Sequence, residues 1–327
     1  MTGQMWVDAW DPSYGSSLTD GAMDDSSARL TLDLETSPAN WAPVTPIVDS
    51  WRPAELLVVD GVRRIDARVW YSDDDHPAPV LGIAASVAAG VVRIGVASDN
   101  PDRRQARVAE IRMGRGVYTS WSNATDMITP VATYPIRHAA GAEFEDLQAA
   151  AQQHMRELEL TAALATRDND DDLMILDGPL SGRTTIPRTL GYIKTHHAAY
   201  LPPELNAVVA RLGPGQRTPV FTIGTNWSRH SWYLRLPTAA PSPWAGVVRC
   251  EAADSLSRDA VIRLADTSAH LLPGLASEPH KDARAPQNLI PIGGLEKALR
   301  HRLGDPTKLH RALAATAAAH FPIGTAS

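Results

Sequence analysis

Two Asp-Gly pairs stand where apolar runs end, and their residue types could hold cations. Asp60-Gly61 follows Leu56–Val59, and Asp177-Gly178 follows Leu173–Leu176. A carboxylate at the end of a buried strand is costly unless its charge is offset, and a divalent cation offsets it well. Two such strands side by side would bring two carboxylates together, as two-metal phosphoryl transfer requires. The alternative is that each Asp-Gly pair only forms a tight turn.

A third carboxylate could come from the helix predicted over residues 143–164. Its apolar residues recur at spacings of three and four and define one face: Leu147, Ala151, His154, Leu158 and Ala162. Glu157 and Glu159 flank this stripe at similar angles, so periodicity does not choose between them. Either could equally be a solvated surface group.

Two later segments could contact a polyanion. Lys194 is one of four lysines and follows the strand-like residues 190–193, so it could bind phosphate. Residues 227–233 interleave aromatic and basic side chains, as surfaces that bind single strands do, although core packing of Trp232 and Leu234 explains half of the pattern equally well. The chain has no Walker A loop and no Gly-x-Gly-x-x-Gly after a strand, which disfavours nucleotide hydrolysis and dinucleotide redox chemistry.

These candidate residues must be positioned by strands and helices in alternation. We predict strands over residues 56–61, 64–70, 80–96 (with a bend near Gly90), 173–178, 220–223, 232–236 and 247–250. We predict further helices over residues 255–266, 295–303 and 306–320. The order indicates a mixed α/β domain over residues 51–327. Residues 1–50 are rich in Asp, Ser, Pro and Trp and predict an irregular or partly ordered lead-in.

Charge is unevenly distributed over the 327 residues. The net charge is −6, but residues 1–80 hold 14 acidic and 5 basic groups, and the rest holds 23 acidic and 26 basic groups. A polyanion would therefore face the later part of the chain. The single cysteine, Cys250, excludes an internal disulfide and a thiolate metal cluster. There is no basic and apolar leader and no apolar run of about 18 residues, so we expect a cytoplasmic protein without membrane contact.

Several of these segments, in this order, resemble the NurA family of nucleases from about residue 55 to about residue 300. The similar segments are Val59-Asp60-Gly61, Arg156-Glu157-Leu158-Glu159, Ile175–Leu180, Gly191-Tyr192-Ile193-Lys194, Ser231–Leu236 and Val248–Glu251. The resemblance implies a ribonuclease-H-like mixed sheet flanked by helices, with additional C-terminal helices. It also implies Mn²⁺- or Mg²⁺-dependent DNA degradation in the 5′-to-3′ direction, a homodimer, and a HerA-type hexameric translocase as partner in DNA end processing.

Carried over by motif, Asp60 and Asp177 become metal ligands and catalytic residues. Glu159 becomes the helix carboxylate, with Glu157 as its alternative. Two bound ions would activate a water and steady the departing 3′ oxygen. Lys194 and the arginines, Arg229 and Arg235 among them, would position the strand.

The C-terminal segment departs from the family, whose members place a tyrosine and then a histidine there. Residues 279–289 stand in that place. His280 could orient a water or bind metal, and Asn288 or Gln287 could contact the scissile phosphate. The departure keeps open a second function, a non-catalytic DNA-binding or scaffold subunit with the same fold. A third possibility is a hydrolase that acts on RNA.

Overall fold

The computed structural model describes Trp10 and residues 24–25, 27–47, 51–73, 77–96, 105–238, 240 and 242–320. The chain divides into two compact units. The first comprises Met1–Val58, Arg93–Arg107 and Asn169–Gly293. The second comprises Val59–Val92, Val108–Asp168 and Gly294–Ser327.

The first unit contains strands in the order β2, β12, β13, β14, β10, β9. Their bounds are Arg29–Thr31, Phe221–Gly224, Ser228–Arg235, Val247–Ala253, Thr189–Ile193 and Asp172–Asp177. Only β9 and β10 pair in parallel; the other pairs are antiparallel. Two further short strands, β1 (Asp24–Asp25) and β11 (Ala198–Ala199), pair with each other.

Strand β13 shows why this unit has a core on each side of its sheet. Alternate side chains of a strand point to opposite faces. Tyr233 packs with the helix α2 (Pro203–Ala210), whereas the neighbouring Trp232 donates from Nε1 to Ser268 Oγ of α3 (Arg258–Leu271) at 3.0 Å. Both side chains are almost completely buried. Two short 3₁₀ helices, η2 (Pro38–Asn40) and η4 (Leu272–Leu275), complete the unit.

Part of the predicted lead-in is ordered within this unit. Strand β2 pairs with β12 through Leu30 and Ile223. The Glu35 carboxylate then accepts from Arg217 Nη1 at 2.8 Å, and Arg217 also binds Asp266 of α3. A buried guanidinium needs partners of this kind, so the segment is tied to the core by paired charges.

The second unit is built on long strands in the order β3, β4, β5, β8. The bounds are Glu55–Tyr71, Val80–Gly95, Arg107–Thr119 and Ile136–His138. The first residues of β3, the last of β4 and the first of β5 belong to the first unit. The strands β6 (Met127–Ile128) and β7 (Thr133–Tyr134) form a small separate pair.

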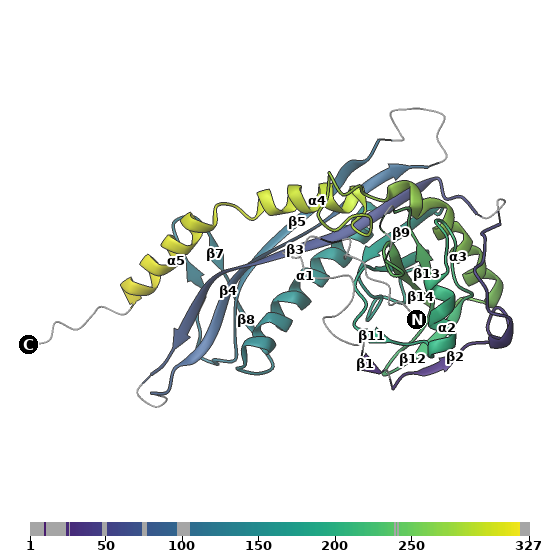
Figure 1. Ribbon diagram of the computed structural model, residues 1–327. Helices are drawn as coiled ribbons and strands as arrows, with labels where there is room; N and C mark the ends of the chain where they lie inside the picture. The colour runs from purple at the N-terminus through teal and green to yellow at the C-terminus, as the bar shows by residue number, and fades with distance from the viewer. Residues whose placement is uncertain are drawn as a thin grey trace, which may run out of the picture. The chain divides into compact units, whose positions relative to one another are not determined.

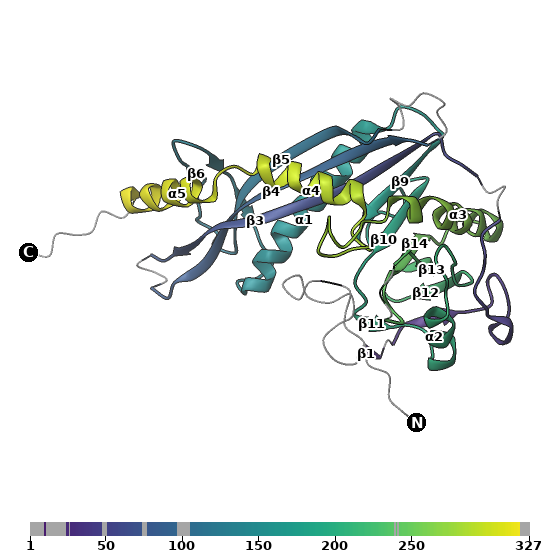
Figure 2. The same cartoon turned by 45° about the horizontal axis from the view of Figure 1, so that its top comes forward.

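Helices cover both faces of these strands (Figures 1 and 2). Ile83 and Ala85 of β4 pack with α1 (Phe144–Thr166). The intervening Ala84 packs with Leu313 of α5 (Pro306–His320) on the other face. The helix α4 (Ile290–Arg302) precedes α5. The predicted α/β class, with mixed strands, flanking helices and additional C-terminal helices, is therefore confirmed. Among the described residues, no helix combines the length and apolar character that crossing a membrane requires.

Two glycines predicted to bend the chain lie inside continuous strands instead. The two strands predicted over residues 56–61 and 64–70 are one strand, β3, and Gly90 lies within β4. A Cβ at Gly61 would lie 2.8 Å from Met155 of α1. One at Gly90 would lie 2.8 Å from the Glu110 carbonyl oxygen of β5 and 3.0 Å from Leu295 of α4. Gly61 is therefore explained by close packing against a helix, and Gly90 by close approach of a neighbouring strand and a helix, and neither by a turn.

Candidate active site

The second Asp-Gly pair ends its strand, as predicted. Asp177 is the last residue of β9, and Gly178 follows with a φ of +106°, a conformation that suits glycine alone. The Gly178 N–H donates to the Tyr192 carbonyl at 2.8 Å, which fixes the turn against β10. Gly191 allows this approach, because a Cβ there would lie 3.1 Å from the Gly178 carbonyl oxygen. The Asp177 carboxylate is thereby held at the C-terminal end of β9.

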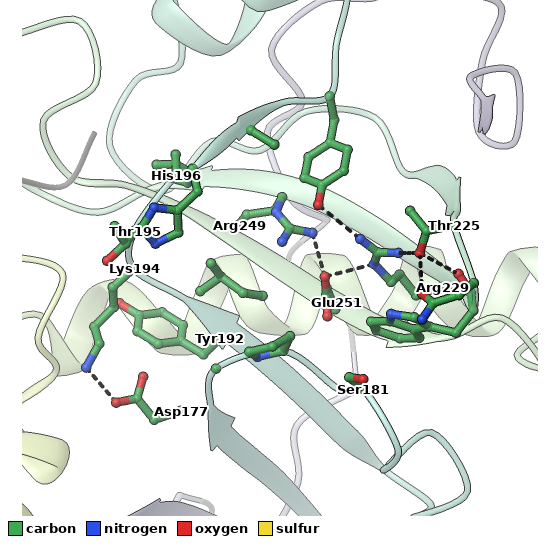
Figure 3. A pocket seen from close by; sticks show the side chains of 18 residues that line it. Asp177, Ser181, Tyr192, Lys194, Thr195, His196, Thr225, Arg229, Arg249 and Glu251 are labelled. Carbon is green, nitrogen blue, oxygen red and sulfur yellow. Dashed lines mark hydrogen bonds and ion pairs between the residues drawn. The ribbon is translucent and has the colours of Figure 1, made fainter. Parts of the chain in front are cut away.

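A chain of polar contacts fixes that carboxylate. Lys194 Nζ donates to Asp177 Oδ2 at 2.6 Å and to Asn288 Oδ1 at 3.0 Å. Asn288 Nδ2 in turn donates to Asp282 Oδ2 at 2.7 Å. Asn288 is fully buried, and the side chains of Lys194 and Asp177 are 10% and 13% exposed. Asn288 therefore orients Lys194, and Lys194 orients Asp177; Figure 3 shows the contact between Lys194 and Asp177.

The first Asp-Gly pair differs, because Asp60 lies inside β3 and not at its end. Asp60 is 6% exposed, and its Oδ1 accepts the Gly61 N–H at 2.8 Å. A carboxylate oxygen of Glu296, on α4, lies within 4.8 Å of an oxygen of Asp60. Two carboxylates this close repel unless a cation or a shared proton stands between them. Their hard oxygen donors fit Mn²⁺ or Mg²⁺.

The helix α1 places its two glutamates in different environments. Glu159 is 4% exposed, and its Oε1 lies 2.7 Å from the point a Cβ of Gly61 would occupy. Its carboxylate therefore reaches β3 at the residue after Asp60. Glu157 points away: its side chain is 54% exposed and lies 3.8 Å from Arg137. Of the two alternatives left open by periodicity, this geometry favours Glu159.

A cleft of about 670 Å³ begins at Asp177 and continues along β10 and β14. Its floor holds Glu251, whose Oε1 accepts from Arg229 Nε at 3.0 Å and from Arg249 Nη1 at 2.6 Å (Figure 3). Glu251 Oε2 accepts the Leu180 N–H at 3.0 Å. The side chains of all three charged residues are at most 8% exposed. The cleft therefore has a rigid, charged floor.

The remaining predicted site residues are placed as follows by the structure. Arg235 donates from Nη1 to the Ala245 carbonyl at 2.7 Å and from Nη2 to the carbonyls of Ala210 and Pro243. These donors bind backbone carbonyls of the first unit, and the nucleic-acid contact of Arg235 stays a prediction. His280 is 69% exposed in its side chain and lies 3.3 Å from Glu278. Gln287 is fully buried.

Sequence reasoning did not select Glu296, Arg249 or Glu251 as site residues. Glu296 becomes a candidate only through the packing of α4 on β3, which no local pattern reports. Arg249 and Glu251 stand two apart on β14, and side chains at this spacing share a face. This spacing within the segment Val248–Glu251 is the sequence signal that could have identified Arg249 and Glu251 as site residues.

The sequence matches the family model described as the NurA domain over residues 50–298. This match covers the candidate residues Asp60, Glu159, Asp177, Lys194 and Glu296. A comparison with curated proteins finds no match.

Proposed function

Because the chain belongs to the NurA family, a family of nucleases, we propose that it is a divalent-metal-dependent nuclease that cleaves DNA. The observation on which the proposal rests most directly is the approach of the Glu296 carboxylate to Asp60 within 4.8 Å. Carboxylate oxygens gathered in this way are the hard donors that Mn²⁺ and Mg²⁺ prefer.

We propose Asp60, Asp177 and Glu159 as the metal ligands, as the motifs imply, with Glu296 as a further ligand. An Mn²⁺ or Mg²⁺ ion held by these residues would lower the pKa of a water and neutralise charge on the departing oxygen. The protein's own residues supply positioning. Lys194 holds the Asp177 carboxylate in one orientation, and Gly61 leaves room for Glu159 beside the strand. The expected product of hydrolysis has a free 3′ hydroxyl.

The finer assignments follow from the family resemblance. We propose 5′-to-3′ exonuclease activity together with endonuclease activity on single strands, in DNA end processing. We further propose a homodimer that works beside a HerA-type translocase. We also propose that His280, exposed beside Glu278, orients a water.

A cleavage assay tests the proposal. Purified protein is incubated with single-stranded DNA labelled at its 5′ end, with Mn²⁺ or with EDTA. Cleavage by the wild type in Mn²⁺, none in EDTA, and loss in Asp60→Asn support a metal-dependent nuclease. Matched single-stranded RNA in the same assay separates a DNA nuclease from an RNA hydrolase. Equal cleavage in EDTA, or by folded Asp60→Asn, contradicts it.

A non-catalytic DNA-binding subunit is the second candidate. One observation favours it: the segment over residues 279–289 lacks the tyrosine and histidine that the family places there. In that case the wild type would bind the labelled strand without shortening it in Mn²⁺, and Asp60→Asn would bind equally well.

A further inference from the structure

The cleft that begins at Asp177 has an excess of positive charge. Among its lining residues are three cations, Lys194, Arg229 and Arg249, against two carboxylates, Asp177 and Glu251. The ion pairs already described hold the three cationic side chains in place, so they are not flexible surface side chains. A preorganised positive cleft of this kind favours an anionic ligand.

Arg249 keeps donors that can reach such a ligand. Its Nη1 donates to Glu251 at 2.6 Å and lies 3.4 Å from Ser231 Oγ. Among the described residues, no acceptor is seen for its remaining N–H groups. The side chain is 8% exposed and lines the cleft. No Arg249 nitrogen is among the buried side-chain atoms that lack a hydrogen-bond partner, so its remaining donors open to the solvent of the cleft and are available to an external acceptor.

Aromatic rings stand beside these cations. The Arg229 guanidinium lies 4.3 Å from the centre of the Trp227 ring and 5.6 Å from that of Tyr200. Arg249 lies 4.9 Å from the Tyr200 ring centre. Both rings line the cleft and are only partly buried. Trp227 is therefore held by a cation while part of its ring stays open to the cleft, as in surfaces that stack bases.

We propose that this cleft is a subsite for one nucleotide of a single strand, with a phosphate bound by Arg249 and the base stacked on Trp227. The inference rests on the proposed function for the identity of the ligand. A cleft of about 670 Å³ lies within the range of small-molecule sites and accommodates a nucleotide. The base must be unpaired, since a duplex does not expose its ring faces. Stacking on an aromatic ring tolerates any base, so we expect little sequence preference.

Binding in the absence of metal tests the subsite separately from cleavage. A fluorescein-labelled thymidine oligonucleotide is titrated with protein in EDTA, and anisotropy gives the dissociation constant. Trp227→Ala is expected to weaken binding about 5- to 100-fold, the usual effect of losing one base–aromatic stack. Trp227→Phe should retain most of the affinity. Trp70→Ala, which removes an exposed tryptophan of the second unit, is the matched control and should bind like the wild type.

Arg249→Gln tests the phosphate contact. In this variant, the slope of the logarithm of affinity against the logarithm of salt concentration should be smaller in magnitude than in the wild type by about one, as expected for the loss of one phosphate contact. Thermal unfolding identifies a variant that fails to fold, and in that case the Trp227 pair decides. The subsite is overturned if the wild type does not bind the oligonucleotide, or if folded Trp227→Ala binds as tightly as the wild type.

The outcomes also separate this inference from the proposed function. If binding in EDTA depends on Trp227 but the protein does not cleave DNA in Mn²⁺, the nuclease proposal is contradicted and the subsite is supported. If the protein cleaves DNA in Mn²⁺ and Trp227→Ala binds and cleaves like the wild type, the subsite is contradicted and the nuclease proposal is supported.

Discussion

Lys194 Nζ lies 2.6 Å from Asp177 Oδ2, and the same amine donates to Asn288 Oδ1 at 3.0 Å. The lysine thus has two fixed acceptors and little freedom to reorient. Sequence reasoning assigned both Lys194 and Asn288 to nucleic-acid binding. The geometry adds a positioning role, because the amine fixes the carboxylate that we propose as a metal ligand.

We predict that Lys194→Met lowers the rate of DNA cleavage in Mn²⁺ by about 100-fold, since misplacing a reacting group by about 1 Å has an effect of that size. Single-turnover cleavage of a labelled strand measures it. Lys308→Met, which removes an exposed lysine from α5, is the control and should cleave at the wild-type rate. A folded Lys194→Met with the wild-type rate would exclude the positioning role.

The two glutamates of α1 allow a matched comparison. Glu159→Gln should reduce cleavage at least 100-fold, because its carboxylate lies against β3 beside Asp60. Glu157→Gln, two residues away on the exposed face, should stay within about twofold of the wild type, since loss of an exposed pair has little effect. Cleavage rates of both variants under the same conditions decide. The reverse order would select Glu157 as the metal ligand.

The helix α1 and the two Asp-Gly pairs show which features of the fold could be predicted from the sequence. Periodicity predicted α1 within two residues, because its apolar stripe is long and regular. Asp177-Gly178 ends a strand as predicted, but Asp60-Gly61 does not. A glycine required by helix packing and a glycine required by a turn look alike in the sequence, and only the positive φ at Gly178 separates them.

The choice between the glutamates had a local signal, whereas Glu296 had none. Met155, Glu159, Ala162 and Thr166 are buried at spacings of four, three and four, so Glu159 belongs to the buried stripe. The apolar stripe predicted from the sequence included Leu158, which lies between Glu157 and Glu159, and so it did not distinguish the two glutamates. Glu296 depends on how α4 packs on β3, which is a property of the folded chain and not of any short segment.

His154 gives the fold a pH dependence. Burial, with a smaller contribution from Arg137, lowers its pKa from 6.5 to about 4, and its Nδ1 lies 2.7 Å from the Tyr118 hydroxyl. Between pH 6.5 and about 4 the unfolded chain binds a proton that the folded chain does not. The free energy of unfolding should therefore decrease as the pH is lowered from 6.5 to about 4. This group contributes at most about 1.4 kcal/mol per pH unit.

Urea unfolding between pH 4.5 and 8 measures this contribution. In His154→Gln, whose amide can still hydrogen-bond Tyr118, the slope below pH 6.5 should be shallower than in the wild type. Above pH 6.5 the two slopes should agree. Identical slopes throughout would mean that His154 does not titrate as its burial requires.

The central claim is that the carboxylates of Asp60 and Asp177 hold divalent cations. Anomalous scattering from crystals soaked in Mn²⁺ locates the ion directly. We predict manganese within about 2.0–2.6 Å of oxygens of both residues, the range for hard cations bound by carboxylates. A map at saturating Mn²⁺ with no peak beside Asp60 and Asp177, or with manganese bound only elsewhere, would contradict the claim.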